Sequence, residues 1–296
     1  MRVCDTSGET LALNRWVFFL SHAPTDYARS RAESAESGPE GGTPVSEGSP
    51  TNGRSILVRG RGSTSDAVVD AVAERDGVSV TRVDGTARGV DDDPDVVFAV
   101  GESALLTLAS SPIDRPIVPV ETETGRYDLA SEDVATAVDA AVRGRYEIVP
   151  HPIVDVRVGG EPAGSALADV TLMTSAPARI SEYGIESPDG WTESVRSDGV
   201  VVATPLGSAG YARAVGGPLL APETGLVTVP VSPYAMHTDN WVVRSPVRLT
   251  VERDEAEVLL RLDDSVAIES VPPHTPVEVD IGRELSLVRP QSIGGR

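Results

Sequence analysis

Short apolar runs alternate with longer amphipathic segments over the first ordered half of the chain. The apolar runs, rich in Val, Ile and Leu, predict strands at residues 55–60, 78–84, 93–101 and 115–121. The amphipathic segments between them predict helices at residues 63–77, 102–111 and 131–144. Because strand and helix alternate, we expect a Rossmann-like α/β domain with a parallel sheet over residues 54–146.

The first predicted helix follows a small polar cluster that is typical of a helix start. We expect Ser63 or Ser65 to cap it. Its inner face is expected to carry Ala67, Val68, Ala71 and Val72.

The pattern changes after Tyr146 to short segments with period-two alternation, separated by Gly, Pro and Asp. This pattern predicts an all-β domain over residues 147–296. Residues 22–54 are rich in Ser, Glu, Gly and Pro, so they cannot bury enough apolar surface to offset the entropy of ordering. We interpret residues 1–53 as an N-terminal extension that is either disordered or artefactual. An artefactual extension would result from an alternative start codon.

The composition of the chain limits the classes of partner that we expect it to bind. The chain of 296 residues has 45 Asp and Glu against 25 basic residues, all of them Arg, for a formal net charge of -20. Such acidity resembles that of proteins from salt-accumulating halophiles and disfavours nucleic acid and membrane surfaces as partners. The apolar run at residues 16–20 is too short to span a bilayer, and the single Cys4 has no internal disulfide partner, so we expect a cytoplasmic protein.

The first candidate functional segment is "FAVGESALL", residues 98–106. Gly101, Glu102 and Ser103 lie where a strand is expected to end and a helix to begin, the arrangement that presents backbone N–H groups to a phosphate. A plain turn with Ser103 as the helix cap explains the same residues. Without lysine there is no Walker loop, so phosphoryl transfer would depend on Mg²⁺, backbone N–H groups and Arg.

A second segment gives a more specific indication of function. "DGVVVATPLGSAGYA", residues 198–212, resembles the NAD kinase signature DG-φ-φ-φ-ATPTGSTAY, where φ is apolar, and departs from it at Leu206, Ala209 and Gly210. Three further segments follow the family's order, namely "VGES" at residues 100–103 for GGDG, "ALAD" at residues 166–169 for ALNE, and "PYAMH" at residues 233–237 for PxxPH.

The resemblance implies an α/β domain followed by a β-sandwich of the NAD kinase type. It implies that Glu102 takes the place of the catalytic aspartate of GGDG, and that nucleotide binding involves a set of loop residues: Gly101, Ser103, Asp169, Thr204, Pro205, Gly207, Ser208 and Tyr211. It also implies NAD and ATP or polyphosphate as ligands, Mg²⁺, and a homodimer or homotetramer.

Several departures bear on activity. Val100 and Ser103 replace glycines of GGDG, and each would strain the backbone if its φ had to be positive. Glu102 is one methylene longer than the family's aspartate, and Ala168 replaces the asparagine of ALNE. Two hypotheses stay open: a NAD kinase that phosphorylates NAD to NADP, and a catalytically degenerate nucleotide-binding paralogue with a regulatory or assembly role. A lipid kinase would need a membrane-facing surface that the sequence lacks.

Other polar positions favour structural roles. Residues 204–211 are equally explained as a capped turn before a helix that ends at Gly216 and Gly217. Asp263 and Asp264 match a family DGQ turn, and we interpret them as a turn. The four histidines, including His237 of "PYAMH", have no metal-ligand spacing, so we expect no transition-metal site.

Overall fold

The computed structural model describes residues 53–84, 93–111, 113–123, 127–176, 179–236 and 238–290. All of these belong to one structural unit, residues 42–296. Cys4, His237 and the predicted extension up to residue 52 lie outside the described residues. In the part of the chain that is described, no helix is both long enough and apolar enough to cross a membrane.

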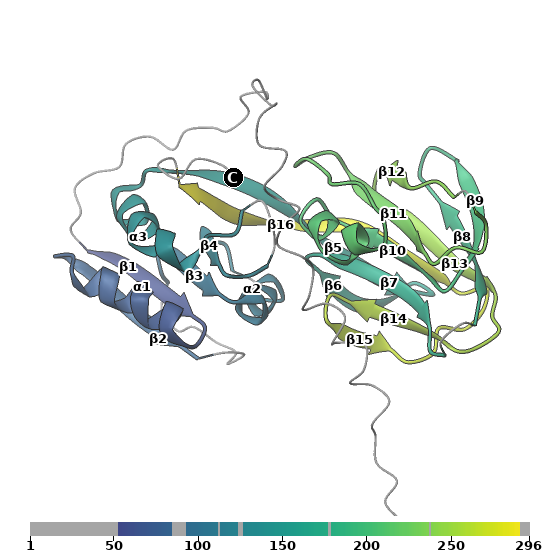
Figure 1. Cartoon of the computed structure of the whole chain (residues 1–296), viewed down its shortest axis with the longest axis horizontal. Helices are drawn as coiled ribbons and strands as arrows, with labels where there is room; N and C mark the ends of the chain where they lie inside the picture. Colours follow the sequence, from purple (N-terminus) through teal and green to yellow (C-terminus); the bar gives the residue numbers. More distant parts are fainter. Residues whose placement is uncertain are drawn as a thin grey trace, which may run out of the picture. The chain divides into compact units, whose positions relative to one another are not determined.

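The first half forms a parallel sheet in the order β2-β1-β3-β4 (Figure 1). Its strands are β1 (Arg54–Arg59), β2 (Val78–Val83), β3 (Val96–Val100) and β4 (Ile117–Val120). Its helices are α1 (Ser63–Ala73), α2 (Glu102–Ala109) and α3 (Val134–Arg143), the last preceded by the short 3-10 helix η3 (Ser131–Asp133). The predicted α/β alternation is confirmed.

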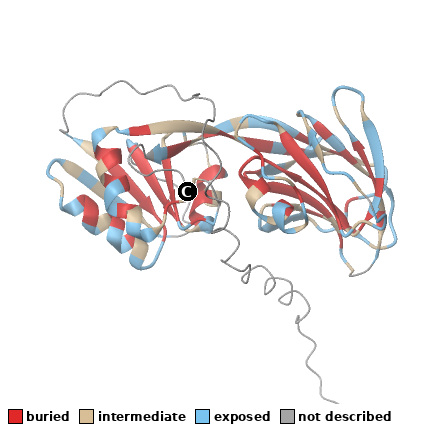
Figure 2. Cartoon of the chain, turned by 45° about the horizontal axis from the view of Figure 1, so that its top comes forward, coloured by how far each residue is buried: buried red, intermediate tan, exposed pale blue. Residues whose placement is uncertain are grey.

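Every residue of β3 and β4 is buried, as expected for parallel strands that are covered on both faces. Alternate residues of one strand point to opposite faces. Val96 and Phe98 share a core with the inner faces of α1 and α3, whereas Val97 and Ala99 share another with α2. The buried positions of the strands and of the inner helix faces are visible in Figure 2.

The predicted start of α1 was wrong in one detail. The N-cap residue is Gly62, with φ of 87°, and no side chain caps the helix. Ser63 is already helical and Ser65 is buried in the first turn, so neither serves as the cap. Ala67 is exposed and Ser65 takes its place on the buried face.

The second half forms two antiparallel layers. The first of these continues the parallel sheet through strands β5 (Tyr146–Val158), β6 (Glu161–Ala166), β8 (Ser181–Glu186), β9 (Thr192–Ser197), β13 (Val247–Arg253) and β16 (Pro276–Pro290). The other is a six-stranded sheet of β12 (Trp241–Val243), β11 (Leu226–Val231), β10 (Gly199–Ala203), β7 (Asp169–Thr174), β14 (Val258–Leu262) and β15 (Ser265–Ile268), with the short helices η4 (Gly207–Ala209) and α4 (Tyr211–Ala214) after β10.

The two layers share one apolar core, which makes this half a β-sandwich. Leu172 and Val200 from the six-stranded sheet lie in the same cluster as Tyr183 and Leu249 from the other layer. The fold class expected from the sequence, α/β plus β-sandwich, is confirmed.

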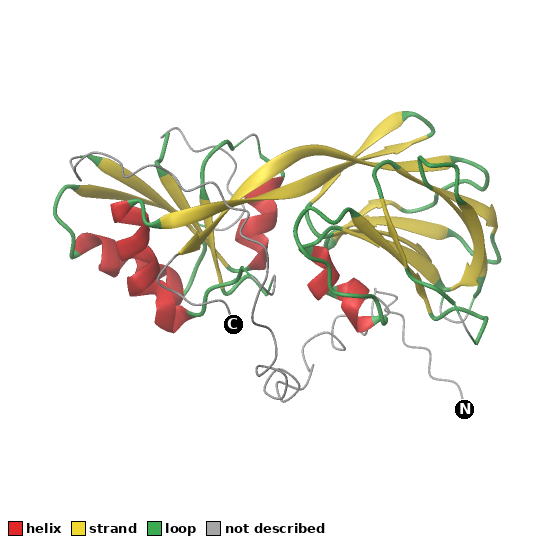
Figure 3. Ribbon diagram, turned by 90° about the horizontal axis from the view of Figure 1, so that it is seen from above, coloured by secondary structure: helices red, strands yellow, loops and turns green. Residues whose placement is uncertain are grey.

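The strands β5 and β16 connect the two halves. They pair with each other along almost their whole length and are the two long neighbouring strands of Figure 3. Near its end β16 pairs in parallel with β4, through Leu287 and Ile117. The last strand of the chain therefore completes the first sheet, an arrangement that period-two patterning could not reveal.

His151 of β5 lies fully buried at this connection, with its ring edge-to-face against Tyr127 at 5.2 Å between centroids. Burial lowers the pKa of His151 from its ordinary 6.5 to about 4. The unfolded chain therefore takes up a proton between pH 6.5 and pH 4 that the folded protein does not, and stability is lost as the pH falls through this window.

We expect the free energy of unfolding to fall by about 3 kcal/mol more in the parent protein than in His151→Phe between pH 6.5 and pH 4. Phenylalanine keeps an aromatic ring beside Tyr127 and does not titrate. Urea unfolding at several pH values measures the difference, and the carboxylates cancel because both proteins contain them. Parallel pH profiles for the two proteins would contradict the prediction.

Candidate functional site

The carboxyl end of β3 positions the proposed catalytic residue. The chain turns at Gly101, whose φ is 85°, and Glu102 is the first residue of α2. No side chain caps this helix, so the expected cap by Ser103 was wrong, and Ser103 lies exposed in the first helical turn. Glu102 thus lies at a helix N-terminus, where backbone N–H groups point outward.

The strain expected at Val100 and Ser103 does not arise. Among residues 100–103 only Gly101 has a positive φ, and it is the one position that retains glycine. Val100 is the last residue of a β-strand and Ser103 is helical, conformations that any L-residue adopts. The departures from GGDG therefore leave the backbone turn intact.

Acidic side chains surround Glu102. Partial burial raises the pKa of Glu102, and the negative charges of Glu123, Asp264 and Asp263 raise it further. Glu123 comes from the segment after β4, where φ is 57°, and its N–H donates to Asp128. Strained non-glycine backbone of this kind is often found at functional sites.

The segment "ALAD" enters the same region from the β-sandwich. Asp169 at the start of β7 is 9 % exposed. Burial raises its pKa to about 7, the charge of Asp263 adds to this, and a hydrogen bond from the Thr171 hydroxyl (3.1 Å) opposes it. The charge of Glu102 also raises the pKa of Asp169, so the two predicted site residues are close enough to interact.

The Asp263 carboxylate fixes the backbone of the ALAD segment. Its carboxylate accepts hydrogen bonds from the N–H groups of Leu167 (2.9 Å), Ala168 (2.7 Å) and Asp169 (3.1 Å). In return its own N–H donates to the Asp169 carbonyl (2.9 Å). Asp263 and Asp264 do form the turn between β14 and β15, as expected, but the turn interpretation missed this carboxylate clamp.

The loop of residues 204–211 lies directly on the ALAD segment. The Thr204 hydroxyl donates to the Leu167 carbonyl at 2.7 Å, and the Thr204 N–H donates to the Ala168 carbonyl at 2.9 Å. A side chain at Gly207 would begin 2.0 Å from the Ala168 carbonyl oxygen, so only glycine fits there.

Not every predicted binding residue in this loop presents its side chain to a ligand. The Ser208 hydroxyl donates to the Pro205 carbonyl (2.7 Å) and accepts from the Leu220 N–H (2.9 Å), so its side chain is fully engaged inside the protein. Thr204 is equally buried. Tyr211 is partly buried, which raises its pKa, and the negative charge of Asp169 raises it further, so the two residues lie within electrostatic range of one another.

Arg261 of β14 was missed from the sequence. Burial raises the pKa of both Asp169 and Tyr211, and the positive charge of Arg261 opposes part of this rise, so Arg261 lies within electrostatic range of both. Its guanidinium donates to the Asp264 carbonyl at 2.7 Å. The signal was available as a lone arginine two residues before the predicted Asp263 turn, in a chain that has no lysine.

The site fits Mg²⁺ only together with a ligand. Carboxylates such as Glu102, Glu123 and Asp264 are the hard oxygen donors that Mg²⁺ prefers. Within the described residues, however, no three acidic, histidine or cysteine side chains are grouped to hold a metal ion. Mg²⁺ usually binds through one or two carboxylates plus substrate phosphates, and this arrangement suits that mode.

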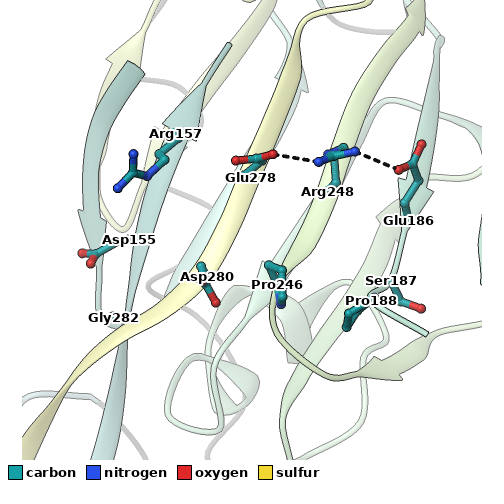
Figure 4. A pocket seen from close by; sticks show the side chains of 10 residues that line it. All are labelled: Asp155, Arg157, Glu186, Ser187, Pro188, Pro246, Arg248, Glu278, Asp280 and Gly282. Atoms are coloured by element: carbon teal, nitrogen blue, oxygen red, sulfur yellow. Dashed lines mark hydrogen bonds and ion pairs between the residues drawn. The ribbon is translucent and has the colours of Figure 1, made fainter. Parts of the chain in front are cut away.

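A shallow hollow elsewhere is unrelated to these loops. It lies on the sheet formed by β5, β16, β13 and β8 (Figure 4). Arg248 there pairs with Glu278 (2.9 Å) and Glu186 (3.4 Å). Its charged groups stabilise one another across exposed strands, and none of its lining residues belongs to the site.

Comparisons with known proteins identify the family. The model of the ATP-NAD kinase C-terminal domain matches residues 167–288. The NAD kinase of Methanosarcina mazei is 30% identical over 204 residues, covering 67% of this chain and 69% of that protein. This chain belongs to the NAD kinase family. The NAD kinase of Methanopyrus kandleri is 29% identical over 195 residues, covering 60% of this chain and 70% of that protein.

Solved NAD kinase structures share the fold. The NAD kinase of Archaeoglobus fulgidus in complex with ATP superposes with a TM-score of 0.62 at 20% identity, covering 80% of this chain and 94% of that one. Yeast NADH kinase complexed with NADH gives a TM-score of 0.65 at 14% identity, covering 80% and 83%.

Within this family, Leu206 is a departure that the fold explains. It replaces a threonine of the signature, is 3% exposed, and packs in one apolar cluster with Leu167 and with Leu105 of α2. Leu206 is therefore a core residue that joins the signature loop to the helix carrying Glu102.

We expect Asp263→Asn to lower the free energy of unfolding by about 1–3 kcal/mol, because the amide nitrogen cannot accept from one of the three N–H groups. Asparagine keeps the size and tolerates the φ of 51°. The pKa of Asp169 should fall as well, since the neighbouring negative charge is lost. Urea unfolding and carboxyl NMR titration measure the two effects.

Asp264→Asn is the matched control, because Asp264 is exposed in the same turn and, among the described residues, its carboxylate is given a hydrogen bond by the Ser265 hydroxyl alone (2.9 Å). We expect it to change stability by less than about 0.5 kcal/mol. Equal effects of the two substitutions would show that the clamp has no special role.

Proposed function

We propose that this protein phosphorylates NAD at the 2′-hydroxyl of its adenosine ribose, with ATP or polyphosphate as donor and Mg²⁺ as cation. Family membership supports NAD and ATP as ligands, and the placement of Glu102 carries the proposal. Glu102 lies at the N-terminus of α2, within electrostatic reach of Asp169 and the Asp263 turn.

Glu102 is the proposed acid–base residue. A general base works best when its pKa is close to the working pH, and the surrounding carboxylates shift the pKa of Glu102 in that direction. Asp169 and Tyr211 are proposed to contact the adenosine ribose and base, while Gly101 and Ser103 line the phosphates. The buried residues Thr204, Pro205, Gly207 and Ser208 are then proposed to act by shaping the loop.

In the proposed reaction, Mg²⁺ would neutralise negative charge on the phosphates. Without lysine, the charge on a transferring phosphoryl group must be offset by the metal, helix N–H groups and Arg. Glu102, Glu123 and Asp264 offer carboxylates on the protein side. When bound, Mg²⁺ would neutralise the donor phosphates, which the acidic side chains alone would repel.

We expect the parent protein to form NADP from NAD, and Glu102→Gln to lower kcat by about 100-fold or more, the contribution typical of general acid–base catalysis. Glu102→Asp restores the carboxylate length of the family signature and should retain activity. A coupled NADP-formation assay in molar KCl with ATP or polyphosphate and MgCl₂ measures this, with binding of NAD followed in parallel by calorimetry.

A catalytically degenerate nucleotide-binding paralogue is the second candidate. Ala168 favours it, because the asparagine of ALNE has no counterpart there. NAD binding without NADP formation in all three proteins would support the paralogue. NADP formation only in Glu102→Asp would place the defect in the longer side chain, and equal rates in the parent and Glu102→Gln would remove Glu102 from the mechanism.

We also propose that the protein acts in the cytoplasm of a halophile as a homodimer or homotetramer. The β-sandwich exposes apolar side chains at and before its edge strand β12, namely Met236 (96% exposed), Tyr234 (70%) and Val242 (53%). Edge strands with exposed apolar residues are suited to pairing with another chain.

Val242→Glu should therefore reduce the molar mass in solution to that of a smaller assembly, because a charge would be buried at the interface. Light scattering after size exclusion measures this, and Val266→Glu on the opposite edge strand β15 is the control. A monomeric parent protein, or an unchanged mass in Val242→Glu, would contradict the proposed interface.

A further inference from the structure

Arg261 is a basic side chain among the acidic groups of the site. It lies on β14, where Leu260 and Leu262 belong to the core of the β-sandwich. Because alternate residues of a strand point to opposite faces, Arg261 points to the outer face of the six-stranded sheet, where it is half-buried. A charged group in this position can reach a ligand that lies on the outer face.

Strand pairing places Arg261 next to Asp169. β14 and β7 are neighbours in the sheet (Figure 1), and Arg261 lies directly opposite Thr171 in their pairing. The Thr171 hydroxyl donates to the Asp169 carboxylate at 3.1 Å. Asp169 shares the outer face with Thr171, since Val170 between them is in the core. Asp169 is therefore a diagonal neighbour of Arg261, at a separation that a long side chain can bridge.

The signature loop borders the same patch of the sheet. β10 pairs with the other side of β7, with Ala203 opposite Asp169, and the chain then enters the loop of residues 204–211. Tyr211 packs against the apolar cluster that contains Ala203. Burial raises the pKa of Tyr211, the charge of Asp169 raises it further, and the charge of Arg261 opposes the rise. Arg261, Asp169 and Tyr211 therefore surround one part of the outer face.

The Arg261 guanidinium is anchored but keeps donors for a ligand. Its side chain donates to the Asp264 carbonyl at 2.7 Å, and it forms no ion pair with a carboxylate in the described part of the chain. Arg248, by contrast, is paired with both Glu186 and Glu278. A guanidinium has five N–H donors in a planar fork, which matches the oxygens of a phosphate group.

The position of Arg261 relative to Glu102 indicates which part of a nucleotide it reaches. The charge of Glu102 acts on Asp169, and that of Asp263 acts on Glu102. Arg261 lies two residues before Asp263, on the strand rather than in the turn. The reacting ribose hydroxyl is proposed to face Glu102, so an anion at Arg261 belongs to another part of the same ligand.

We propose that Arg261 binds the diphosphate bridge of the dinucleotide acceptor and makes the site selective for adenosine that carries a 5′-linked phosphate. This inference rests on the proposed function and adds a residue that determines its specificity. The diphosphate bridge carries two negative charges, which the carboxylates of the site repel. Arg261 offsets this repulsion at the acceptor, whereas Mg²⁺ is assigned to the phosphates of the donor.

The test is calorimetric binding of ADP-ribose, which contains the diphosphate bridge, and of adenosine, which has no phosphate. We expect Arg261→Gln to weaken ADP-ribose binding by about tenfold or more, the effect of a lost hydrogen bond to a charged group, and adenosine binding by less than about twofold. In the NADP-formation assay this variant should raise the KM for NAD by about tenfold or more. Its kcat should stay within about twofold of the parent value, because the diphosphate does not change during the reaction.

Three controls accompany this variant. Arg261→Lys keeps the charge without the fork and should weaken ADP-ribose binding less than Arg261→Gln does. Arg253→Gln removes an exposed arginine of β13, outside the site, and should leave both affinities unchanged. As a third control, 2′-AMP carries its phosphate on the ribose hydroxyl that is proposed to react, so Arg261→Gln should change its affinity by less than about twofold.

Unchanged ADP-ribose binding by Arg261→Gln would overturn the inference. Equal losses for adenosine and ADP-ribose would also overturn it, because Arg261 would then contact the nucleoside or support the Asp264 turn, and a loss confined to 2′-AMP would place Arg261 at the reacting hydroxyl instead. If the parent forms NADP and Arg261→Gln keeps the parent KM for NAD, this inference fails and the proposed function stands. If ADP-ribose binding depends on Arg261 but no protein forms NADP, the diphosphate contact stands and the proposed function fails.

Discussion

The apolar cluster that contains Leu105, Leu167 and Leu206 is the constraint on which the site depends. Each of these residues lies close in sequence to a polar group of the site. Leu105 shares α2 with Glu102, Leu167 precedes Asp169 by two residues, and Leu206 lies in the signature loop. Dense apolar packing resists displacement, so this one cluster holds three separate segments in register.

Repulsion between the carboxylates of the site acts against this apolar packing. Glu102, Asp169 and Asp263 all have raised pKa values, first because each is partly or largely removed from water and then because neighbouring carboxylates repel it. Asp263 offsets part of this cost with three backbone hydrogen bonds. Binding of a cation or of a ligand rich in hydrogen-bond donors would relieve this repulsion, which is in line with the proposed function.

Much of the fold could be predicted from the sequence, because alternating apolar and amphipathic segments report local structure directly. The parallel sheet, α2 after Gly101 and the all-β second half followed from such patterns, whereas the β-sandwich was implied by the family resemblance. The return of β16 to pair with β4 could not be predicted, since strand pairing across more than one hundred residues leaves no local periodicity. The prediction of a cap at Ser63 was wrong because Gly62 is the N-cap residue and Ser63 is already the first residue of the helix.

The sequence could indicate candidate site residues that stand in a motif, but not residues whose role depends on contacts across the fold. Glu102 and Asp169 were identified from their positions in motif remnants. The clamp by Asp263 and the proximity of Arg261 to Asp169 both depend on partners distant in sequence.

The departures from the family signature become interpretable once the backbone is known. A substitution matters most where glycine supplies a conformation or a space that no side chain allows. Gly101 has the positive φ and Gly207 the close approach to Ala168, and both are still glycine. Val100 and Ser103 occupy ordinary strand and helix conformations, and Leu206 fills the core, so the framework of the site is retained. The departures at Glu102, Ala168 and Asp169 instead change side-chain chemistry, because one carboxylate is a methylene longer than in the family motifs, one amide is lost and another carboxylate is a methylene shorter.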